Sequence, residues 1–361
     1  MNLYEQATLV AIQNLVPPLN TFLLKRYFPD GEIFPTPDCI VEYKKGNKIV
    51  APFVLPYKGG ISIGRDGYKA TKMNPPHIAP QRNLTIDDIQ EKGFGEYYGT
   101  LKDPAKRAAE FLTKDLADLS EMIDRRREWM AAELLTTGKL TMTHYADEYG
   151  KKGVDFILQF YEEEFDNEYV PEISWKDPDA DIYGDLSRMI QKAAKNGQAV
   201  SDLICNPVVV EYIFKNKRMK EVLNSQVAST FINLNFKDLP DGVSHVCTLN
   251  IYGRNISVFS YMEDYSEKNM ETGEMETKSL IPEDTIVLAA PKMGKCVYGM
   301  ITQMEEKDRD FHSYPKLSKV PKIYTDTKTD NRTVIVKSKP IVMPKNADGW
   351  VVSKVLLHDL E

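Results

Sequence analysis

The sequence lacks the residue patterns that disulfide-bonded, zinc-binding and membrane-spanning proteins carry. Its four cysteines are Cys39, Cys205, Cys247 and Cys296, and no two of them form a CxxC pair. Cysteines this far apart predict buried free thiols in a reducing compartment. No apolar run approaches the roughly 20 residues of a membrane span, and the first residues lack the basic and then apolar order of a secretion signal. We therefore expect synthesis in the cytoplasm, with neither a signal peptide nor a membrane anchor.

Charge and composition limit the class of protein and the partners that the sequence predicts. The 361 residues carry a net charge of −7, with 42% hydrophobic and 27% charged residues. This balance is ordinary for a globular protein, and it does not favour nonspecific binding to nucleic acid or to an anionic membrane. Because the chain is longer than a single hydrophobic core usually supports, we expect two lobes, or one lobe with long segments that extend from it.

The motifs for metal binding are incomplete. Asp177, Asp179 and Asp181 match the first three ligands of a calcium loop, but Ile182 replaces the glycine of position six and Arg188 the glutamate of position twelve. The favoured interpretation is a loop that begins a new unit and caps the next helix. The histidines, which form no HxxxH or HxH pair and are expected at the surface or at interfaces, are His77, His144, His245, His312 and His358.

The motifs for catalysis also lack the flanking structure or the residue spacing that they require. Residues 60–64 match the GxSxG pattern of a nucleophile elbow around Ser62, but that motif needs a strand that turns sharply into a helix, and a proline-rich extended run follows here. Residues 93–99 miss the glycine spacing of a dinucleotide-binding loop, and Gly294-Lys295 lacks the upstream glycine of a P-loop. We predict no catalytic residue, no cofactor and no metal, with a serine hydrolase using Ser62 as the alternative.

Three consecutive arginines at positions 125–127 could contact nucleic acid. Asp124 and Glu128 flank them, so a solvated or subunit-facing ion-pair network is favoured. The lysines at positions 44–48 are ambiguous in the same way.

One long helix is the strongest secondary-structure signal. Asp103 and Pro104 supply an N-cap and a first-turn residue, and Gly138 supplies a stop. A rise of 1.5 Å per residue gives a spine of about 50 Å. The residues that keep close to helical spacing between these ends are Ala105, Ala108, Leu112, Leu116, Leu119, Ile123, Met130 and Leu134.

The residues before this helix are expected to form an arm, a hairpin and a flap. Residues 1–38 hold two short apolar clusters that need a surface to dock on. Residues 39–43 and 49–51 flank a Gly46-Asn47 turn, which predicts a hairpin. Residues 53–89 form an extended flap broken by Pro75, Pro76 and Pro80. Because such a flap leaves backbone groups unpaired, we expect it to be buried against another chain.

After the helix the pattern changes to mixed helices and strands. Strands are predicted at 139–143, 154–160, 202–205, 248–252, 256–261, 285–290, 297–301, 333–337, 339–343 and 350–355, and helices at 182–195 and 208–223. This order predicts an α+β lobe without repeated βαβ units. The last strands are expected to rejoin the lobe of the long helix.

This order of elements resembles the major capsid protein E family of lambda-like tailed phages and prophages. The similarity covers nearly the whole chain. The segments that carry it are Arg65-Asp66-Gly67 with residues 74–80 of the flap, residues 138–143, Leu203-Ile204-Cys205-Asn206-Pro207, residues 280–288 and residues 338–342. The charged stretch at 265–278 departs from the lambda-type pattern.

The resemblance implies the α+β fold of the Hong Kong 97 phage capsid, with an arm and an extended E-loop. The expected divisions are 1–38 for the N-terminal arm, 39–100 for the hairpin and E-loop, 101–176 for the peripheral domain with the spine helix, 177–304 for the axial domain, and 305–361 for returning strands of the peripheral domain.

The resemblance also implies a function without catalysis. It implies a phage or prophage major capsid protein that self-assembles, as pentamers and hexamers, into an icosahedral shell around double-stranded DNA. The implied partners are further copies of the chain, portal, scaffolding and in some cases decoration proteins, and packaged DNA through weak nonspecific contact. The implied location is the virion capsid, after synthesis in the cytoplasm of a bacterial host. A cellular nanocompartment shell of the same fold is a further alternative.

Overall fold

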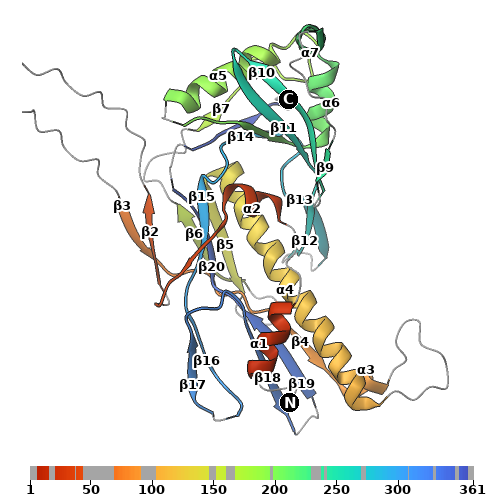
Figure 1. Ribbon diagram of the computed structural model, residues 1–361, viewed down its shortest axis with the longest axis vertical. Coiled ribbons are helices and arrows are strands. Elements are labelled where there is room, and N and C mark those ends of the chain that lie inside the picture. Colours follow the sequence, from red (N-terminus) through yellow and green to blue (C-terminus); the bar gives the residue numbers. More distant parts are fainter. Residues whose placement is uncertain are drawn as a thin grey trace, which may run out of the picture.

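The fold is organised around one long helix, α4 (Pro104–Thr137), which runs from the lower end of the molecule to the underside of a seven-stranded sheet at the upper end (Figure 1). The computed structural model describes residues 6–15, 21–36, 38–43, 69–90, 103–145, 152–159, 167–195, 198–228, 237–239, 242–269, 274–307, 309–327, 331–345 and 349–356. Across these residues no helix combines the length and the apolarity that crossing a membrane requires.

The ends of α4 confirm the sequence prediction. The side chain of Asp103 accepts a hydrogen bond from the backbone N–H of Ala105 at 3.2 Å, and Pro104 occupies the first turn. Gly138 ends the helix with φ of 72°, and its N–H donates to the carbonyl of Leu134 at 2.9 Å. A side chain at this φ would be strained, which explains the glycine. Of the apolar positions predicted for the buried stripe, only Ala105 is exposed.

A small sheet covers the lower half of α4. Its strands are β18 (Val320–Asp326), β19 (Asn331–Lys337) and β4 (Gln81–Leu84), in that order. The helices at this end are α1 (Gln6–Leu15) and α3 (Ile86–Gln90). The core between α1, α4 and this sheet consists of Leu9, Leu112, Leu116, Leu119, Ile123, Ile323, Val334 and Val336.

The upper lobe is a sheet buried on both faces. Its strand order is β7 (Glu168–Tyr169), β21 (Val351–Lys354), β14 (Thr285–Ala289), β8 (Asp202–Cys205), β11 (Arg254–Tyr261), β10 (Val243–Ile251) and β9 (Lys237–Leu239). Three helices cover the face away from α4 (Figure 1): α5 (Ile182–Lys195), α6 (Pro207–Lys215) and α7 (Lys217–Ala228). Side chains alternate along β8, so that Leu203 and Cys205 belong to the core on the helix side and Ile204 to the core beside α4.

A third sheet and the short helix α2 (Phe22–Tyr27) connect the two halves. The sheet contains β1 (Asp30–Ile33), β15 (Gly294–Tyr298) and β20 (Pro340–Pro344), with β1 parallel to β15. Residues of α2, the second half of α4 and the sheets on either side form one continuous core. The chain therefore passes from the N-terminal helices into the junction of the two lobes.

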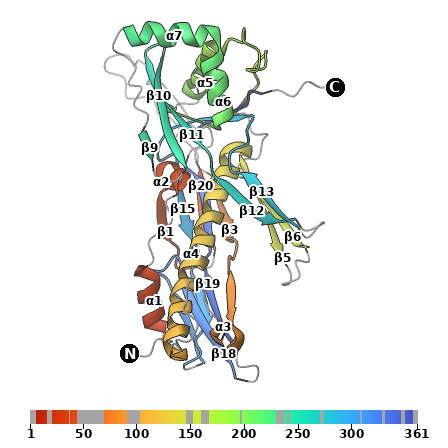
Figure 2. The same cartoon turned by 90° about the vertical axis from the view of Figure 1, so that its right-hand side faces the viewer.

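Four two-stranded ribbons complete the described structure. They are β2 (Cys39–Tyr43) with β3 (Lys69–Met73), β5 (Lys139–Tyr145) with β6 (Lys152–Gln159), β12 (Asp264–Lys268) with β13 (Met275–Ser279), and β16 (Ile301–Met304) with β17 (Phe311–Tyr314). In Figure 2, α1 lies on one side of α4, and the ribbons β5–β6 and β12–β13 project from the other side.

Four sequence predictions need correction or qualification. The flap expected over residues 53–89 is not extended to its end, because α3 is helical and β4 pairs with β19 of the same chain. The partner that the structure gives β2 is β3, in register from Cys39 opposite Met73 to Tyr43 opposite Lys69, whereas residues 46–51 lie outside the described residues. The helix expected at 208–223 is two helices, because Asn216 is extended, with ψ of 133°, and separates α6 from α7. The strands β18, β19 and β20 return to α4 as expected, but β21 pairs with β14 in the upper sheet.

Candidate assembly surfaces

A carboxylate of α4 holds the start of α2. The Oε1 atom of Glu128 accepts the N–H of Leu23 at 2.7 Å and the hydroxyl of Tyr261 at 3.0 Å, and Oε2 accepts the N–H of Leu24 at 3.1 Å. These N–H groups at a helix start have no partner within their own helix. Burial raises the pKa of Glu128 to about 7, against the opposing effect of the two N–H groups. One side chain thus joins the N-terminal region, the spine helix and β11 of the upper lobe.

The other end of α2 is tied to the upper sheet. Tyr27 donates its hydroxyl to Oδ2 of Asp202 on β8 at 3.0 Å, and Arg26 pairs with the same oxygen. The guanidinium of Arg26 also lies over the ring of Phe259, 4.6 Å from its centroid. Asp202 is buried, so its charge requires these donors. The helix α2 is therefore attached at both ends.

The middle of α4 carries a buried ionic cluster. Arg127 pairs with Asp124 at 2.9 Å and with Asp30 of β1. Lys319 reaches Asp124 at 2.8 Å, and Tyr298 donates its hydroxyl to Asp30 at 2.7 Å. The sequence contains a signal for this cluster: position 127 lies four residues after Ile123 and three before Met130, within the apolar stripe. A charged residue in that stripe needs buried partners.

The other two arginines of the 125–127 run also form ion pairs. Arg125 pairs with Glu121 one turn earlier, at 2.5 Å, and Arg126 pairs with Glu267 of β12 at 2.8 Å. Arg126 stacks over Trp129, 4.9 Å from the ring centroid. The three arginines form ion pairs, as predicted, but the cluster around Arg127 is buried within the subunit and is not solvated. The ribbon of β12 and β13 contacts α4 in part through the pair of Arg126 with Glu267.

A groove lies between the two projecting ribbons. It has a volume of about 670 Å³ and is lined by residues 76–80, by α4, by β5 and by β12. Its α4 side includes Met122, Arg126, Trp129 and Glu133. Burial raises the pKa of Glu133 and leaves this partly buried carboxyl on the groove wall. The groove is lined by apolar side chains such as Met122 and Trp129 and by the charged side chains of Arg126, Glu133 and Glu267.

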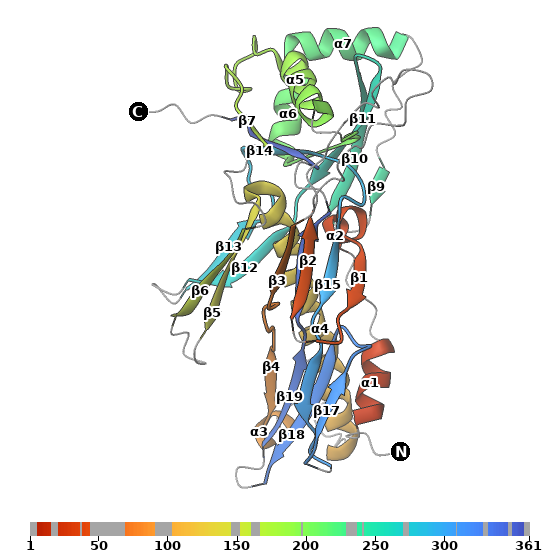
Figure 3. The same ribbon diagram turned by 90° about the vertical axis from the view of Figure 1, so that its left-hand side faces the viewer.

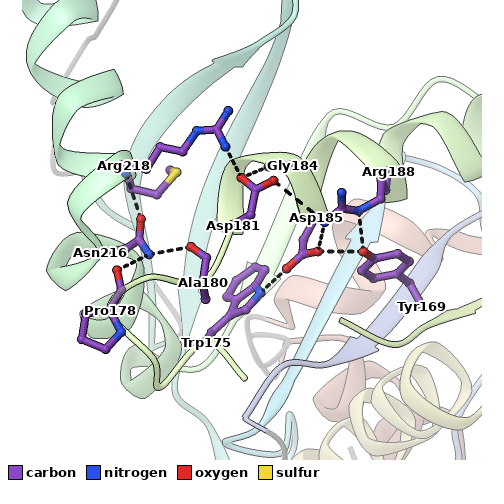
Figure 4. A network of polar contacts seen from close by, with 11 residues as sticks. Tyr169, Trp175, Pro178, Ala180, Asp181, Gly184, Asp185, Arg188, Asn216 and Arg218 are labelled. Atoms are coloured by element: carbon purple, nitrogen blue, oxygen red, sulfur yellow. Dashed lines mark hydrogen bonds and ion pairs between the residues drawn. The ribbon is translucent and has the colours of Figure 1, made fainter. Parts of the chain in front are cut away.

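In the upper lobe, a buried aspartate holds the segment before α5 (Figure 4). Asp185 accepts the indole N–H of Trp175 at 2.8 Å, the hydroxyl of Tyr169 at 2.7 Å and the guanidinium of Arg188 at 2.7 Å. Burial raises the pKa of Tyr169, so its hydroxyl stays protonated and donates. Every polar atom of this carboxylate has a partner, as a stabilising network requires.

The acidic loop at 177–181 has the capping role expected of it. Asp181 accepts the N–H of Gly184 at 3.1 Å and pairs with Arg218 of α7 at 2.6 Å (Figure 4). A Cβ on Gly184 would lie 2.0 Å from Oδ2 of Asp181, so the glycine makes room for the cap. Asp179 pairs with Lys217 at 2.9 Å. Among the described residues, no group of three or more His, Cys, Asp or Glu side chains could hold a metal ion.

The remaining motifs have structural explanations or lie outside the described residues. Gly294 packs under Phe28, where an added Cβ would lie 2.2 Å from Cδ1 of the ring. Cys39, Cys205, Cys247 and Cys296 are free and buried, as expected, and burial raises the pKa of Cys247 to about 11. Ser62, the 44–48 lysines and residues 93–99 lie outside the described residues. His77 is exposed, and His245 lies against the ring of Phe259 at 5.4 Å.

Comparison with known proteins supports the prediction of a capsid subunit. Residues 5–355 match the family described as phage major capsid protein E. The chain belongs to this family. Membership places the protein among the structural capsid proteins of phages and prophages, and the α+β fold expected from the sequence is confirmed by solved relatives.

Two curated relatives match part of the chain. The P21 prophage-derived major head protein of Escherichia coli O6:H1 strain CFT073 is 24% identical over 156 residues, which are 43% of this chain and 45% of that protein. The major capsid protein of Enterobacteria phage P21 matches to the same extent. The chain thus aligns with less than half the length of these relatives.

Two solved structures match nearly the whole chain. The putative capsid protein of an E. coli CFT073 prophage has a TM-score of 0.64 at 17% identity, covering 97% of this chain and 98% of that one. A phage-related protein from Bordetella bronchiseptica RB50 has a TM-score of 0.51 at 10% identity, covering 98% of both chains. At these identities the likeness concerns the fold.

Proposed function

We propose that this capsid protein self-assembles, as pentamers and hexamers, into an icosahedral shell that encloses double-stranded DNA. The observation that carries the proposal is the set of ribbons that project from the body with large apolar side chains uncovered. Ile157 on β6 is 56% exposed, Met275 on β13 is 65% exposed and Phe311 on β17 is 74% exposed. Two-stranded ribbons are marginally stable in water by themselves, so these surfaces suit burial against neighbouring subunits.

Each segment that the sequence predicts has a proposed role in assembly. Residues 1–38 act as the arm, 39–100 as the hairpin and E-loop, 101–176 as the peripheral domain, 177–304 as the axial domain and 305–361 mainly as returning strands of the peripheral domain. In this scheme β21 belongs with the axial sheet. The ribbon β2–β3 is the base of the E-loop, whose outer part is buried on the next copy of the protein.

The remaining assignments follow from the same role. The protein acts without catalysis or a cofactor, is made in the cytoplasm of a bacterial host and resides in the virion. Portal, scaffolding and decoration proteins are its further partners, and packaged DNA contacts the shell weakly. Many modest contacts hold such a shell, because multivalency converts weak pairwise interfaces into a stable closed assembly.

A deletion in the E-loop tests this function. Replacing residues 46–66 by a short Gly-Ser linker keeps β2 and β3, so the subunit should fold with an unchanged unfolding midpoint. We expect the wild-type protein to sediment as shells or as rings of five and six, and the variant to sediment as a monomer. Normal shells from the variant would refute the role of the loop. A wild-type protein that stays monomeric would contradict the proposed function itself.

A further inference from the structure

The turn between β10 and β11 places a tyrosine at the tip of a hairpin. Ile251 pairs directly with Arg254, which leaves Tyr252 and Gly253 as the two loop residues. Their φ angles are 47° and 82°, and a two-residue loop with both φ angles positive favours asparagine followed by glycine. An aromatic residue at positive φ carries a steric cost that asparagine carries to a lesser degree. Tyr252 therefore occupies a position that the turn itself disfavours.

This tyrosine is also uncovered. Tyr252 is 72% exposed, and a Cβ added to Gly253 would meet no atom within 4 Å. The strands β10 and β11 run to the upper end of the molecule, beside α7 and opposite to the end that holds β18 and β19 (Figure 3). Strained residues cluster where proteins bind partners, and tyrosine is a frequent anchor of interfaces.

The tip is held in one conformation by its neighbours. Asn250 accepts the N–H of Gly253 at 3.0 Å, and its amide donates to the side-chain oxygen of Asn255 at 3.0 Å. The backbone N–H of Tyr252 donates to the hydroxyl of Tyr183 on α5 at 3.2 Å, and the centroids of the two rings lie 5.2 Å apart. Because these contacts order the tip in the isolated subunit, little conformational freedom remains to be lost on binding.

The tip carries an unpaired cation as well. Arg254 is exposed, and no carboxylate or aromatic ring among the described residues pairs with it. Arg218 of α7 differs, since it pairs with Asp181 at 2.6 Å and lies over the ring of Tyr183. A guanidinium is attracted to the face of a tyrosine ring. One tip thus presents both halves of a complementary contact, an uncovered ring and an unpaired guanidinium.

This pairing on a single tip favours a second copy of the chain as the partner. A contact between two different patches of identical subunits is heterologous, and its repetition can close a ring. Identical tips around an axis satisfy both groups, whereas an unrelated partner would have to supply both. Neighbours are rotated by about 60° in a ring of six and by about 72° in a ring of five. A cation–π contact tolerates this difference, because it requires only that the charge lie within about 6 Å of the ring centroid.

We propose that Tyr252 of one subunit stacks against Arg254 of the next subunit around the five-fold and six-fold axes. The inference rests on the proposed self-assembly and names one of its contacts. Each contact is small, and its repetition around the ring gives it weight in the assembly.

Substitution of the tyrosine separates assembly from stability. Tyr252→Asn introduces the residue that the turn prefers, so the urea unfolding midpoint of the monomer should be unchanged or higher. The same variant lacks the ring, so shells seen by sedimentation and negative-stain microscopy should require about a tenfold higher subunit concentration. Tyr252→Phe keeps the ring and should assemble like the wild type. A residue that served only the fold would show a lower midpoint with unchanged assembly.

Substitution of the arginine tests the other half of the contact. Arg254→Gln should raise the required concentration to a similar extent. Because both side chains belong to one contact, the double variant Y252N/R254Q should assemble no worse than the weaker of the two single variants. The matched control is Lys220→Gln, which removes an exposed cation of α7 outside the tip and should assemble like the wild type.

Cross-linking tests which residues meet. Subunits with Tyr252→Cys and subunits with Arg254→Cys are mixed and treated with a short bismaleimide, since the original side chains hold the two backbones further apart than a disulfide spans. The four native cysteines are buried and should not react. We expect a cross-linked dimer in the mixture and none with either protein alone.

Two outcomes would overturn the inference while leaving the proposed function intact. Wild-type, Y252N and R254Q shells that form at the same concentration would mean that the tip makes no contact between subunits, as it would if it bound another capsid component. A cross-linked dimer from the Tyr252→Cys protein alone would mean that two tyrosines meet instead. Absence of wild-type shells and rings would contradict the proposed function itself.

Discussion

The buried carboxyl of Glu128 predicts an unusual dependence of stability on pH. Burial raises its pKa from an ordinary 4.5 to about 7. Each factor of ten in proton affinity is worth about 1.4 kcal/mol, so the ionised side chain costs about 3 kcal/mol relative to the unfolded chain. Because the folded state holds the proton to a higher pH, this contribution is present below pH 4.5 and is lost as the pH rises to about 7.

Glu128→Gln removes the charge and keeps the shape. The amide oxygen still accepts one of the N–H groups of α2, but the NH₂ group cannot accept the second, which costs about 1–3 kcal/mol. At pH 5 we expect the variant to be the less stable of the two. Between pH 5 and pH 8 the wild type should lose up to about 3 kcal/mol relative to the variant, so the two curves should converge or cross.

The assay is urea unfolding of the monomeric protein followed by circular dichroism at 222 nm. Glu121→Gln is the matched control, since Glu121 lies on the same helix but is half exposed and pairs only with Arg125 among the described residues. Its pH profile should run parallel to that of the wild type. A parallel profile for Glu128→Gln, or a wild type that gains stability relative to the variant as the pH rises, would refute the assignment of the buried carboxyl.

Two further substitutions test the packing at the junction of the lobes. Gly294→Ala should destabilise the subunit by about 1–3 kcal/mol in the same urea assay, because the new Cβ would overlap the ring of Phe28; an unchanged midpoint would argue against this close contact. Arg127→Met leaves Asp124 with fewer partners and should cost about 3 kcal/mol, while Arg125→Met, at an exposed pair, should stay within about 0.5 kcal/mol; equal effects of the two would contradict the buried cluster.

Local signals explain what the sequence predicted well. Both ends of α4 depend on residues within one turn of them, namely the cap at Asp103 and the left-handed Gly138. The same holds for α6, where Asn206 accepts the N–H of Val208 at 3.1 Å and Pro207 opens the helix. Asn216 was an equally local signal that the helix prediction missed: its Oδ1 accepts the N–H of Met219 at 3.0 Å and so starts α7.

Long-range pairing explains what the sequence could not provide. Among the described residues, β2 pairs with a strand that begins 26 residues after its last residue, Tyr43 to Lys69, and no local signal predicts this pairing. The strand β21 joins β14 through a register that no nearby residue encodes. The roles of Arg127 and Glu128 depend on Asp30 and Leu23, about 100 positions away, which only the folded chain brings near.

Electron cryomicroscopy of the purified protein would show directly whether it assembles into shells. We expect icosahedral shells in which the lobe that contains α5, β10 and β11 surrounds the five-fold and six-fold positions, and the outer part of the 39–100 segment lies on a neighbouring subunit. Monomers at all concentrations, or an assembly in which the 39–100 segment contacts only its own subunit, would contradict this expectation.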